Sequence, residues 1–353
     1  MDRANISSSP ISWHLIRLRV AATAILTCTL ITMSPEPAAA QPWQAAHPAS
    51  AGWSQEKIEA AEDYVARLGP TAFMIVQNGK IIMRWGDISR KVEVASVRKS
   101  LLGALYGIAV ADGHISLTSS LADLGMDDKA PPLTAAEKRA TVRDLLMARS
   151  GVYHEAAHET AEMRRKRPSR GSHAPGTFWF YNNWDFNALA TIYRQRTGED
   201  LFKSFAQRIA APIGMEDFAI GDGRYVTEPP SIHPAYPFAL SARDAARFGQ
   251  LFVDGGQWNG RQVIPADWVR ESTTAYSQTD RGSRGYGYLW WTLRADVFGP
   301  GAALASGFGG QFIAIVPSKH LVVVQVVARG DRNKALRTSN FIAMLRGITA
   351  TAP

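Results

Sequence analysis

A serine and a lysine stand three residues apart within residues 93–102, as Ser96 and Lys99. Residues three apart share one face of a helix, so both side chains would point the same way if a helix begins here. The first helical turn offers free N–H groups and the positive dipole end, which stabilise an alkoxide or an oxyanion. A partly buried lysine at that end loses its charge more easily and can act as a base. The spacing therefore favours a nucleophile–base pair.

The same spacing also occurs at Ser54 and Lys57, so the context of each pair decides its interpretation. Ser54 opens a polar, amphipathic segment, where a serine N-cap with early acidic residues is the ordinary interpretation. Ser96 instead precedes an almost continuously apolar segment, residues 101–111, which is typical of a buried helix. We therefore expect Ser96 to lie close to the core.

A second candidate motif places Tyr181 and Asn183 two residues apart. In an extended segment, side chains with this spacing face the same side. A lysine nearby would favour the phenolate, so Tyr181 could take the proton of Ser96 or share it with Lys99 as a coupled pair. Asn183 offers a donor and an acceptor to a substrate amide or ester. The alternative is an aromatic core cluster followed by an Asn cap on the next helix.

A third candidate motif, Ser306, Gly307, Phe308 and Gly309, stands directly before an expected strand at residues 311–316. Glycines there allow a ligand to approach the backbone closely at the edge of a sheet. The backbone N–H of Phe308, paired with that of Ser96, could form an oxyanion hole. A plain glycine-rich turn is the alternative.

The order of these motifs, Ser-x-x-Lys, then Tyr-x-Asn, then a small-residue glycine motif, resembles the penicillin-recognising serine hydrolases. The likeness covers about residues 54–348 and points to the class C β-lactamase-related branch. That branch includes esterases, D-aminopeptidases, D-alanyl-D-alanine carboxypeptidases and 6-aminohexanoate-oligomer hydrolases. The resemblance implies an α+β fold, acylation of Ser96 by the substrate, and release of the acyl group by water. We expect no cofactor and no metal.

The third motif departs from the family pattern at its first position. The family usually has Lys or His there, whereas this chain has Ala305. That cation recognises the carboxylate of a β-lactam, so its absence favours an esterase or amidase acting on a small ester, amide or peptide. A β-lactamase and a D-alanyl-D-alanine carboxypeptidase remain as alternatives.

His154, Glu155 and His158 form a rival motif, because two histidines four apart on a helix can bind zinc with the glutamate as base. The stretch follows a helix stop at Gly151 and shows no evident third ligand, so we interpret it as a chance match on a loop at the rim of the cleft. A non-enzymatic alternative also stands, in which the fold serves as a cell-wall binding module that acylates slowly or never.

The order of secondary-structure signals predicts the architecture. Strand-like runs at 71–77 and 81–85 flank Asn78-Gly79, a strong hairpin signal. Further strands are expected at 286–293, 311–316 and 321–328, after a long middle dominated by helical signals. This order predicts an α+β fold, with an antiparallel sheet assembled from both ends of the chain, flanked by helices, and a mainly helical lobe inserted.

We assign the hydrolase domain to residues 54–350, after a linker at 41–53. Its α/β lobe would comprise about 54–112 and 280–350, and its helical lobe about 113–279. A cleft between two such lobes is the usual place for a ligand.

Residues 1–40 have the features of a secretory signal: a basic start, an apolar stretch, and an Ala-x-Ala site before Gln41. We expect cleavage near Ala40, no stable membrane anchor afterwards, and a periplasmic or secreted protein. Cys28 is the single cysteine, so the mature chain would form no disulfide. The formal net charge of +8 suits solubility or an anionic surface, and export argues against a nucleic-acid partner. The sequence does not indicate an oligomeric state.

Overall fold

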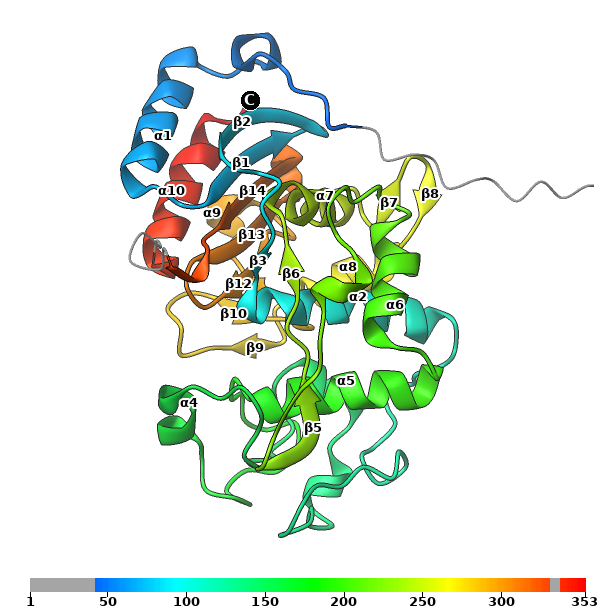
Figure 1. The fold of residues 1–353 in the computed structure, drawn as a ribbon. Helices are drawn as coiled ribbons and strands as arrows, with labels where there is room; N and C mark the ends of the chain where they lie inside the picture. Colours follow the sequence, from blue (N-terminus) through cyan, green and yellow to red (C-terminus); the bar gives the residue numbers. More distant parts are fainter. Residues whose placement is uncertain (1–41, 331–336) are drawn as a thin grey trace, which may run out of the picture. The chain divides into compact units, whose positions relative to one another are not determined.

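The computed structural model describes residues 42–330 and 337–353, so the expected signal sequence lies outside the described residues (Figure 1). An antiparallel sheet of eight strands forms the centre, in the order β2-β1-β14-β13-β12-β11-β10-β9. The strands are β1 (Ala72–Gln77), β2 (Lys80–Gly86), β9 (Ser277–Gln278), β10 (Gly285–Tyr286), β11 (Trp291–Thr292), β12 (Ala303–Gly307), β13 (Gln311–Val316) and β14 (Leu321–Val326). The predicted α+β fold with an antiparallel sheet flanked by helices is confirmed.

The two ends of the chain meet at strand β1. It pairs on one side with β2 and on the other with β14, where Ala72 lies opposite Val326. Asn78 and Gly79 join β1 to β2 with φ of 50° and 69°. Two positive φ angles are typical of the tight turn that matches the twist of paired strands, so the predicted hairpin is confirmed.

Strand β13 is covered by helices on both faces. Phe312 stacks on Phe341 of α10 (Thr338–Thr351), with ring centroids 4.3 Å apart. The next residue, Ile313, points to the other face, where Gly249 of α7 (Ala242–Val253) packs against it. Successive strand residues face opposite sides, so a strand buried on both faces is apolar throughout rather than alternating.

One predicted strand, at residues 286–293, is wrong as a single element. The structure divides it into the hairpin β10–β11, with Leu289 in the turn at a φ of 62°. Gly287 lets the hairpin approach Ser272 closely, because a Cβ there would lie 2.2 Å from the carbonyl oxygen of Ser272. The backbone therefore turns where it touches α8 (Ala266–Ser272), a contact that strand propensity does not reveal.

The segment expected as a loose linker is held on the edge of the sheet. Ile81 donates its N–H to the carbonyl of Gln44 at 2.9 Å and accepts from the N–H of Ala46 at 3.0 Å. The indole of Trp53 is buried and donates to Gln77 Oε1 at 2.6 Å. These residues therefore cover β2 before α1 (Gln55–Leu68) begins.

The middle of the chain supplies most of the helices, and α2 connects them to the sheet region. Buried α2 contacts α5, α6 and α8. The remaining α-helices are α2 (Arg98–Ala111), α3 (Val142–Leu146), α4 (Ala161–Lys166), α5 (Asn183–Thr197), α6 (Leu201–Phe205) and α9 (Ala295–Phe298). Three short strand pairs lie outside the main sheet: β3 (Val92–Glu93) with β6 (Ala239–Leu240), β4 (Val226–Glu228) with β5 (Ser231–Ala235), and β7 (Gln257–Trp258) with β8 (Arg261–Gln262).

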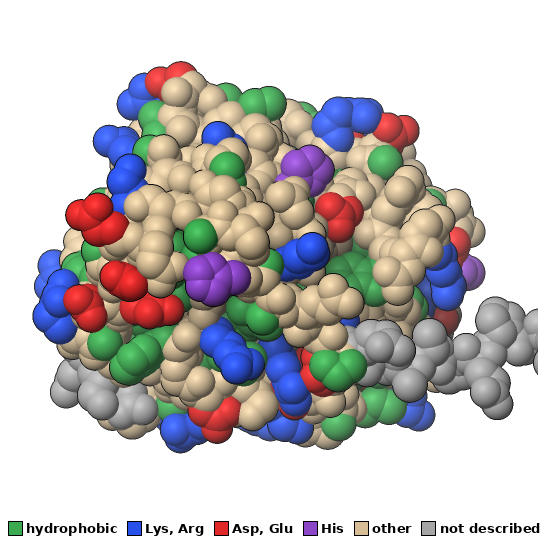
Figure 2. All heavy atoms as spheres, turned by 90° about the horizontal axis from the view of Figure 1, so that it is seen from above, with side chains coloured by type: hydrophobic (Ala, Val, Ile, Leu, Met, Phe, Trp, Pro, Cys, Tyr) green, Lys and Arg blue, Asp and Glu red, His purple; other side chains and the backbone are tan. Residues whose placement is uncertain are grey.

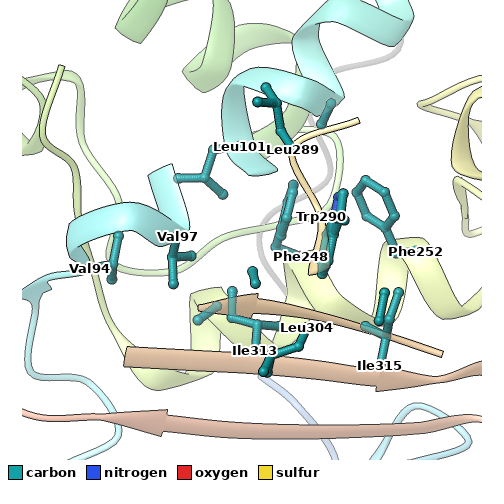
Figure 3. Close-up of a cluster of buried hydrophobic side chains, with 14 of the residues drawn as sticks. Val94, Val97, Leu101, Phe248, Phe252, Leu289, Trp290, Leu304, Ile313 and Ile315 are labelled. Carbon is teal, nitrogen blue, oxygen red and sulfur yellow. The ribbon is translucent and has the colours of Figure 1, made fainter. Parts of the chain in front are cut away.

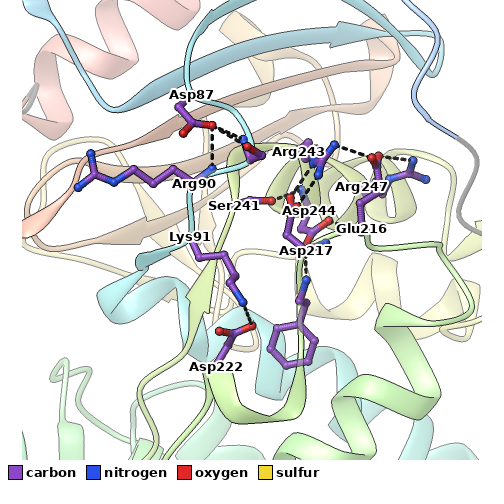
Figure 4. Close-up of polar contacts among 12 residues, drawn as sticks. Asp87, Arg90, Lys91, Glu216, Asp217, Asp222, Ser241, Arg243, Asp244 and Arg247 are labelled. Atoms are coloured by element: carbon purple, nitrogen blue, oxygen red, sulfur yellow. Dashed lines mark hydrogen bonds and ion pairs between the residues drawn. The ribbon is translucent and has the colours of Figure 1, made fainter.

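A polar network fastens the start of α7 to the loop before β4 (Figure 4). Asp244 accepts three backbone N–H groups, from Glu216 at 2.7 Å, Asp217 at 3.0 Å and Phe218 at 2.8 Å. Arg243 forms ion pairs with the side chains of Glu216 and Asp217. A carboxylate that satisfies several buried donors fixes a loop more firmly than a surface ion pair does.

Charged side chains of both signs are interspersed on the face seen from above in Figure 2, so the basic excess is not gathered there. Within residues 42–330 and 337–353, the helices are all too short or too polar to cross a membrane.

Candidate active site

Ser96 lies in a single 3-10 turn, Ala95–Val97, directly before α2. The sequence predicts it in the first turn of the helix, and the structure places it just ahead of that turn. The reason is Ala95, whose φ of 47° lies in the left-handed region and bends the chain between β3 and α2. Non-glycine residues rarely adopt this conformation, and such strain is typical of functional turns.

Apolar side chains on either side of Ser96 anchor this turn. Val94 and Val97 point down toward β12 and β13, while Leu101, one turn further along α2, points into the same apolar cluster (Figure 3). All three are at most 1 % exposed. The Ser96 side chain is therefore the half-buried, polar member of a turn whose neighbours are fixed in the core.

The Lys99 side chain reaches Ser96. Lys99 Nζ donates a hydrogen bond to Ser96 Oγ at 2.8 Å. Burial, and then the charge of Arg98, hold the pKa of Lys99 well below its usual range. The ammonium group lies against two rings, 5.0 Å from the centroid of Tyr181 and 4.8 Å from that of Phe186. A lysine that gives up its proton easily can act as a base toward the serine it touches.

Tyr181 completes the group around Ser96. Burial raises the pKa of Tyr181, and a hydrogen bond with the Ser96 side chain acts in the opposite direction. Its ring stacks on Trp291 with centroids 5.3 Å apart. The phenol is thus held by aromatic packing while its oxygen faces the serine, which suits a group that passes a proton to and from it.

Polar contacts at the start of α5 fix the position of Tyr181. Asn182 caps the helix by accepting from the N–H of Trp184 at 3.1 Å, and its amide also donates to the carboxylate of Asp185 at 2.9 Å. Ser150 donates to the same carboxylate oxygen. Burial raises the pKa of Asp185 well above its usual range. The sequence alternative of an Asn cap on this helix is thus present in the structure, whereas the contacts of Asp185 were not foreseen.

Asn182, which stands between Tyr181 and Asn183, is extended with a φ of −116° and a ψ of 112°, and α5 begins at the next residue, Asn183. The Asn183 amide donates to the carbonyl of His158 at 2.7 Å. Its Oδ1 is buried and has no hydrogen-bond partner within the described residues. The acceptor oxygen and the second N–H of the amide are therefore left for a ligand, because an amide nitrogen carries two hydrogens.

Strand β12 passes directly behind Ser96, and Gly307 makes this close approach possible. A Cβ on Gly307 would lie 2.4 Å from the carbonyl oxygen of Val94 and 3.1 Å from the backbone nitrogen of Ser96. Ser306 lies one residue before this glycine, and the exposed Phe308 lies one residue after it. Gly309 continues the turn toward β13 with a φ of 82°. The third motif is therefore brought to the backbone of the predicted nucleophile.

Comparisons with known proteins agree with this arrangement. A sequence model described as Beta-lactamase matches residues 59–345, which is most of the chain. The chain belongs to the beta-lactamase family. One relative with a similar sequence is a D-aminopeptidase of Brucella anthropi. The two are 29% identical over 171 residues, which make up 41% of this chain and 31% of that protein. The match to that protein is therefore partial.

Solved structures of the beta-lactamase family share the fold. A putative 6-aminohexanoate-dimer hydrolase from Bacillus anthracis superposes with a TM-score of 0.63 at 22% identity, covering 82% of each chain. A class C beta-lactamase superposes with a TM-score of 0.63 at 16% identity, covering 87% of this chain and 99% of the other. At these identities the likeness concerns the fold alone.

The structure also places Ala305 and the rival zinc motif. Ala305, where the family usually has a cation, is buried in β12 and pairs with Ile313. The rival zinc motif lies in irregular chain, with His158 at a φ of 61°, so its two histidines do not share a helix face. Across the described residues, no three potential metal-binding side chains cluster.

A pocket of about 520 Å³ opens beside Tyr181. Aromatic residues from 178 to 181 line one part of it, while Arg149, Glu162 and Arg281 contribute charges. Sequence reasoning predicted a cleft but missed the arginines around the phenol, Arg98, Arg281 and Arg284, each of which favours the phenolate of Tyr181. Arg98 lies within the Ser96–Lys99 motif, whereas no local pattern marks Arg281 and Arg284, because long-range packing brings them to the phenol.

Proposed function

We propose that this protein is an exported serine hydrolase that cleaves an ester or amide bond through an acyl-enzyme. The observation that carries the proposal is the 2.8 Å hydrogen bond between Lys99 Nζ and Ser96 Oγ, at a place where burial lowers the pKa of the lysine. A serine becomes a nucleophile when a neighbouring base accepts its proton. Membership of the beta-lactamase family supports the same chemistry.

The reaction begins with attack of Ser96 Oγ on the substrate carbonyl carbon, while Lys99 and Tyr181 accept the hydroxyl proton. The backbone N–H groups of Ser96 and Phe308 stabilise the oxyanion. The close packing of Gly307 against Ser96 supports this pairing. The carbon–oxygen or carbon–nitrogen bond then breaks, and the leaving group takes the proton from Tyr181, which leaves Ser96 acylated.

Water completes the cycle. The same Lys99–Tyr181 pair accepts a proton from water, the hydroxide attacks the acyl carbonyl, and the proton returns to Ser96 Oγ as the carboxylic acid leaves. Asn183 Oδ1, buried and without a partner in the described part of the chain, would position the substrate by accepting one of its N–H groups. Ser306 and Gly309 would contact the substrate from β12 and the turn that follows.

An esterase or amidase fits the site better than a β-lactamase or a D-alanyl-D-alanine carboxypeptidase. The buried Ala305 supplies no charge at the position where the family cation recognises a carboxylate. The partial likeness to a D-aminopeptidase supports an amide or small peptide as substrate. The signal features of residues 1–40 support a periplasmic or secreted location.

Covalent labelling tests the proposal. The purified chain is incubated with a fluorophosphonate probe and its intact mass is measured, with Ser96→Ala alongside and a chelator present in a parallel sample. We expect one adduct on the native chain in both buffers and none on Ser96→Ala. Absence of an adduct on the native chain would refute the serine mechanism. Loss of ester hydrolysis on chelation alone would instead favour zinc at His154 and His158.

A further inference from the structure

A groove between α1 and α10 lies outside the proposed active site. Its volume is about 500 Å³, within the range of about 300–1,000 Å³ that is usual for small-molecule sites. The two helices that form its walls, blue and red in Figure 1, come from opposite ends of the described chain. Trp53, Ile58, Ile75 and Ile348 line its inner part and are at most 6 % exposed. The groove therefore reaches from the surface down to the apolar core.

Each of the two helices contributes one face to the groove. Lys57, Ala61 and Tyr64 stand four and three residues apart along α1, the spacing of side chains on one side of a helix. The lining residues of α10 extend from Asn340 to Thr351, which is about 16 Å at about 1.5 Å per residue. The groove is therefore elongated along the helices, a shape that suits an extended chain.

The sheet separates this groove from the proposed nucleophile. Ile75 lies opposite Val323, which lies opposite Ala314, so these three side chains point to one face of the sheet. Phe312 shares that face and stacks on α10. Ile313 points to the other face, into the apolar cluster that anchors the turn of the nucleophile (Figure 3). A molecule in the groove would therefore not occupy the active site.

The polar groups of the groove define which end of a ligand they would meet. The Trp53 indole already donates to Gln77, so it offers only its ring. Lys57 is the one charged side chain among the described residues that line the groove, and it is exposed. Glu56 and Glu59 stand one and two residues away, on other faces of the helix, and Glu59 accepts from a glutamine side chain at 2.9 Å. Within the described residues, no carboxylate forms an ion pair with Lys57.

An apolar groove with a single cation at its rim complements an amphiphile with a single negative charge. The chain of such a molecule is stabilised by leaving water, while its charged end stays at the surface beside the ammonium group. We propose that the groove between α1 and α10 binds an unbranched monocarboxylic acid, with its alkyl chain against Trp53 and Ile348 and its carboxylate at Lys57. This site takes no part in the proposed reaction of Ser96.

Three ligands that differ only in their head group test the inference. Decanoate, decan-1-ol and decylamine have the same chain and carry a negative charge, no charge and a positive charge at neutral pH. Binding to the purified chain is measured by isothermal titration calorimetry below the micelle concentration. We expect one decanoate to bind per chain, more tightly than decan-1-ol, with decylamine weakest. Ser96→Ala should bind decanoate as the native chain does, because the sheet lies between the two sites.

Variants at the groove locate the site. Lys57→Gln should reduce the preference for decanoate over decan-1-ol by about threefold to tenfold, whereas Lys203→Gln, which removes an exposed charge from α6, should leave it unchanged. Ala61→Leu and Ala343→Leu place larger side chains in the groove from its two walls and should weaken binding of all three ligands by about tenfold. Ala66→Leu makes the same change at an exposed position of α1 outside the groove and should have no effect.

Several results would overturn the proposal. Absence of decanoate binding, or equal binding of the three head groups, would refute a carboxylate site. Unchanged binding in both Ala61→Leu and Ala343→Leu would refute its location in the groove. If vesicles of an anionic phospholipid bind in a manner that depends on Lys57 while decanoate does not bind, the groove faces a lipid surface rather than a free acid. None of these results bears on labelling of Ser96, so the hydrolase proposal is tested separately.

Discussion

The sheet and the site around Ser96 differ in whether their buried polar atoms have hydrogen-bond partners. In the sheet, Gln77 accepts from the Trp53 indole at 2.6 Å and donates to the carbonyl of Lys319 at 3.1 Å. Gln325 donates to the carbonyl of Gly310 at 3.0 Å. Around the site, the buried atoms without a partner within the described residues include Arg98 Nη1, Asn183 Oδ1 and Tyr236 Oη.

This difference separates stability from function. Buried polar atoms in proteins are normally hydrogen-bonded, because an unmade bond costs free energy. Gln77 and Gln325 follow this rule, so they stabilise the sheet. The region around Ser96 breaks it and also places two adjacent basic side chains, Arg98 and Lys99, in the interior. Such costs persist where they serve a ligand or a reaction.

Lys99→Met is the substitution that we expect to separate enzymatic activity from stability the most. Without the base, kcat/KM for ester hydrolysis should fall by about 10²–10⁴-fold. The pKa of Lys99 is lowered in the folded chain, so below the pKa of the unfolded lysine folding disfavours its proton and loses stability. Removing the amine should therefore leave the free energy of unfolding at neutral pH unchanged or raise it, as urea denaturation would measure.

Gln77→Met is the matched change in the sheet. It leaves the Trp53 indole and the carbonyl of Lys319 without partners, so the free energy of unfolding should fall by about 1–3 kcal/mol. The kcat/KM of the folded fraction should stay unchanged, since β1 does not reach Ser96. If Lys99→Met lost as much stability as Gln77→Met, the proposed difference between the sheet and the site would be wrong.

Gly307→Ala tests how closely β12 must approach the nucleophile. The added methyl group would lie 2.4 Å from the carbonyl of Val94, so the backbone of β12 or of the Ser96 turn must move. We expect kcat/KM to fall by about a hundredfold, since small displacements of reacting groups have such effects. Stability should fall by about 1–3 kcal/mol.

Gly347→Ala is the control for the glycine substitution. No atom lies within 4 Å of its Cβ position in α10, and alanine is the better helix former. Its free energy of unfolding should rise by about 0.5–1 kcal/mol with no change in kcat/KM. Full activity of Gly307→Ala in the same assay would show that the close approach of β12 is not needed.

Much of the sheet could be predicted from sequence because its signals are local. Asn78-Gly79 determines the β1–β2 hairpin, and the nearly continuous apolar runs of β13 and β14 predict strands buried on both faces. The β10–β11 hairpin could not be predicted, because the bend arises where Gly287 meets the backbone of Ser272. That contact depends on tertiary packing rather than on the strand itself.

The residues of the site also divide into those that the sequence predicts and those that it does not. Ser96 and Lys99 are one turn apart, so their contact follows from helix geometry, and the structure contains it. Arg284 and Trp291 carry no such pattern, because their relation to Tyr181 depends on how β10 and β11 meet a loop about a hundred residues earlier. Sequence predicts residues that act through spacing, whereas charges that act through space become visible only in the fold.

Arg98 offers the smallest but most specific test of this difference, because its charge acts on both members of the proposed base pair. It lowers the pKa of Lys99, for which burial is the larger cause, and it lowers the pKa of Tyr181 against the larger, opposite effect of burial. Removing the charge by Arg98→Met should therefore raise both pKa values. Neutral Lys99 would then require a higher pH, and the Tyr181 proton would be retained to a higher pH.

The expected result is a bell-shaped profile of kcat/KM against pH that moves upward as a whole, on both limbs, in Arg98→Met. Arg98→Lys keeps the charge and should leave the profile near that of the native protein. A merely structural role for Arg98 would lower the height of the profile without moving its limbs, because the height depends on the amount of active protein and the limbs depend on the two pKa values. A shift of one limb alone would show that the charge of Arg98 does not act on both Lys99 and Tyr181.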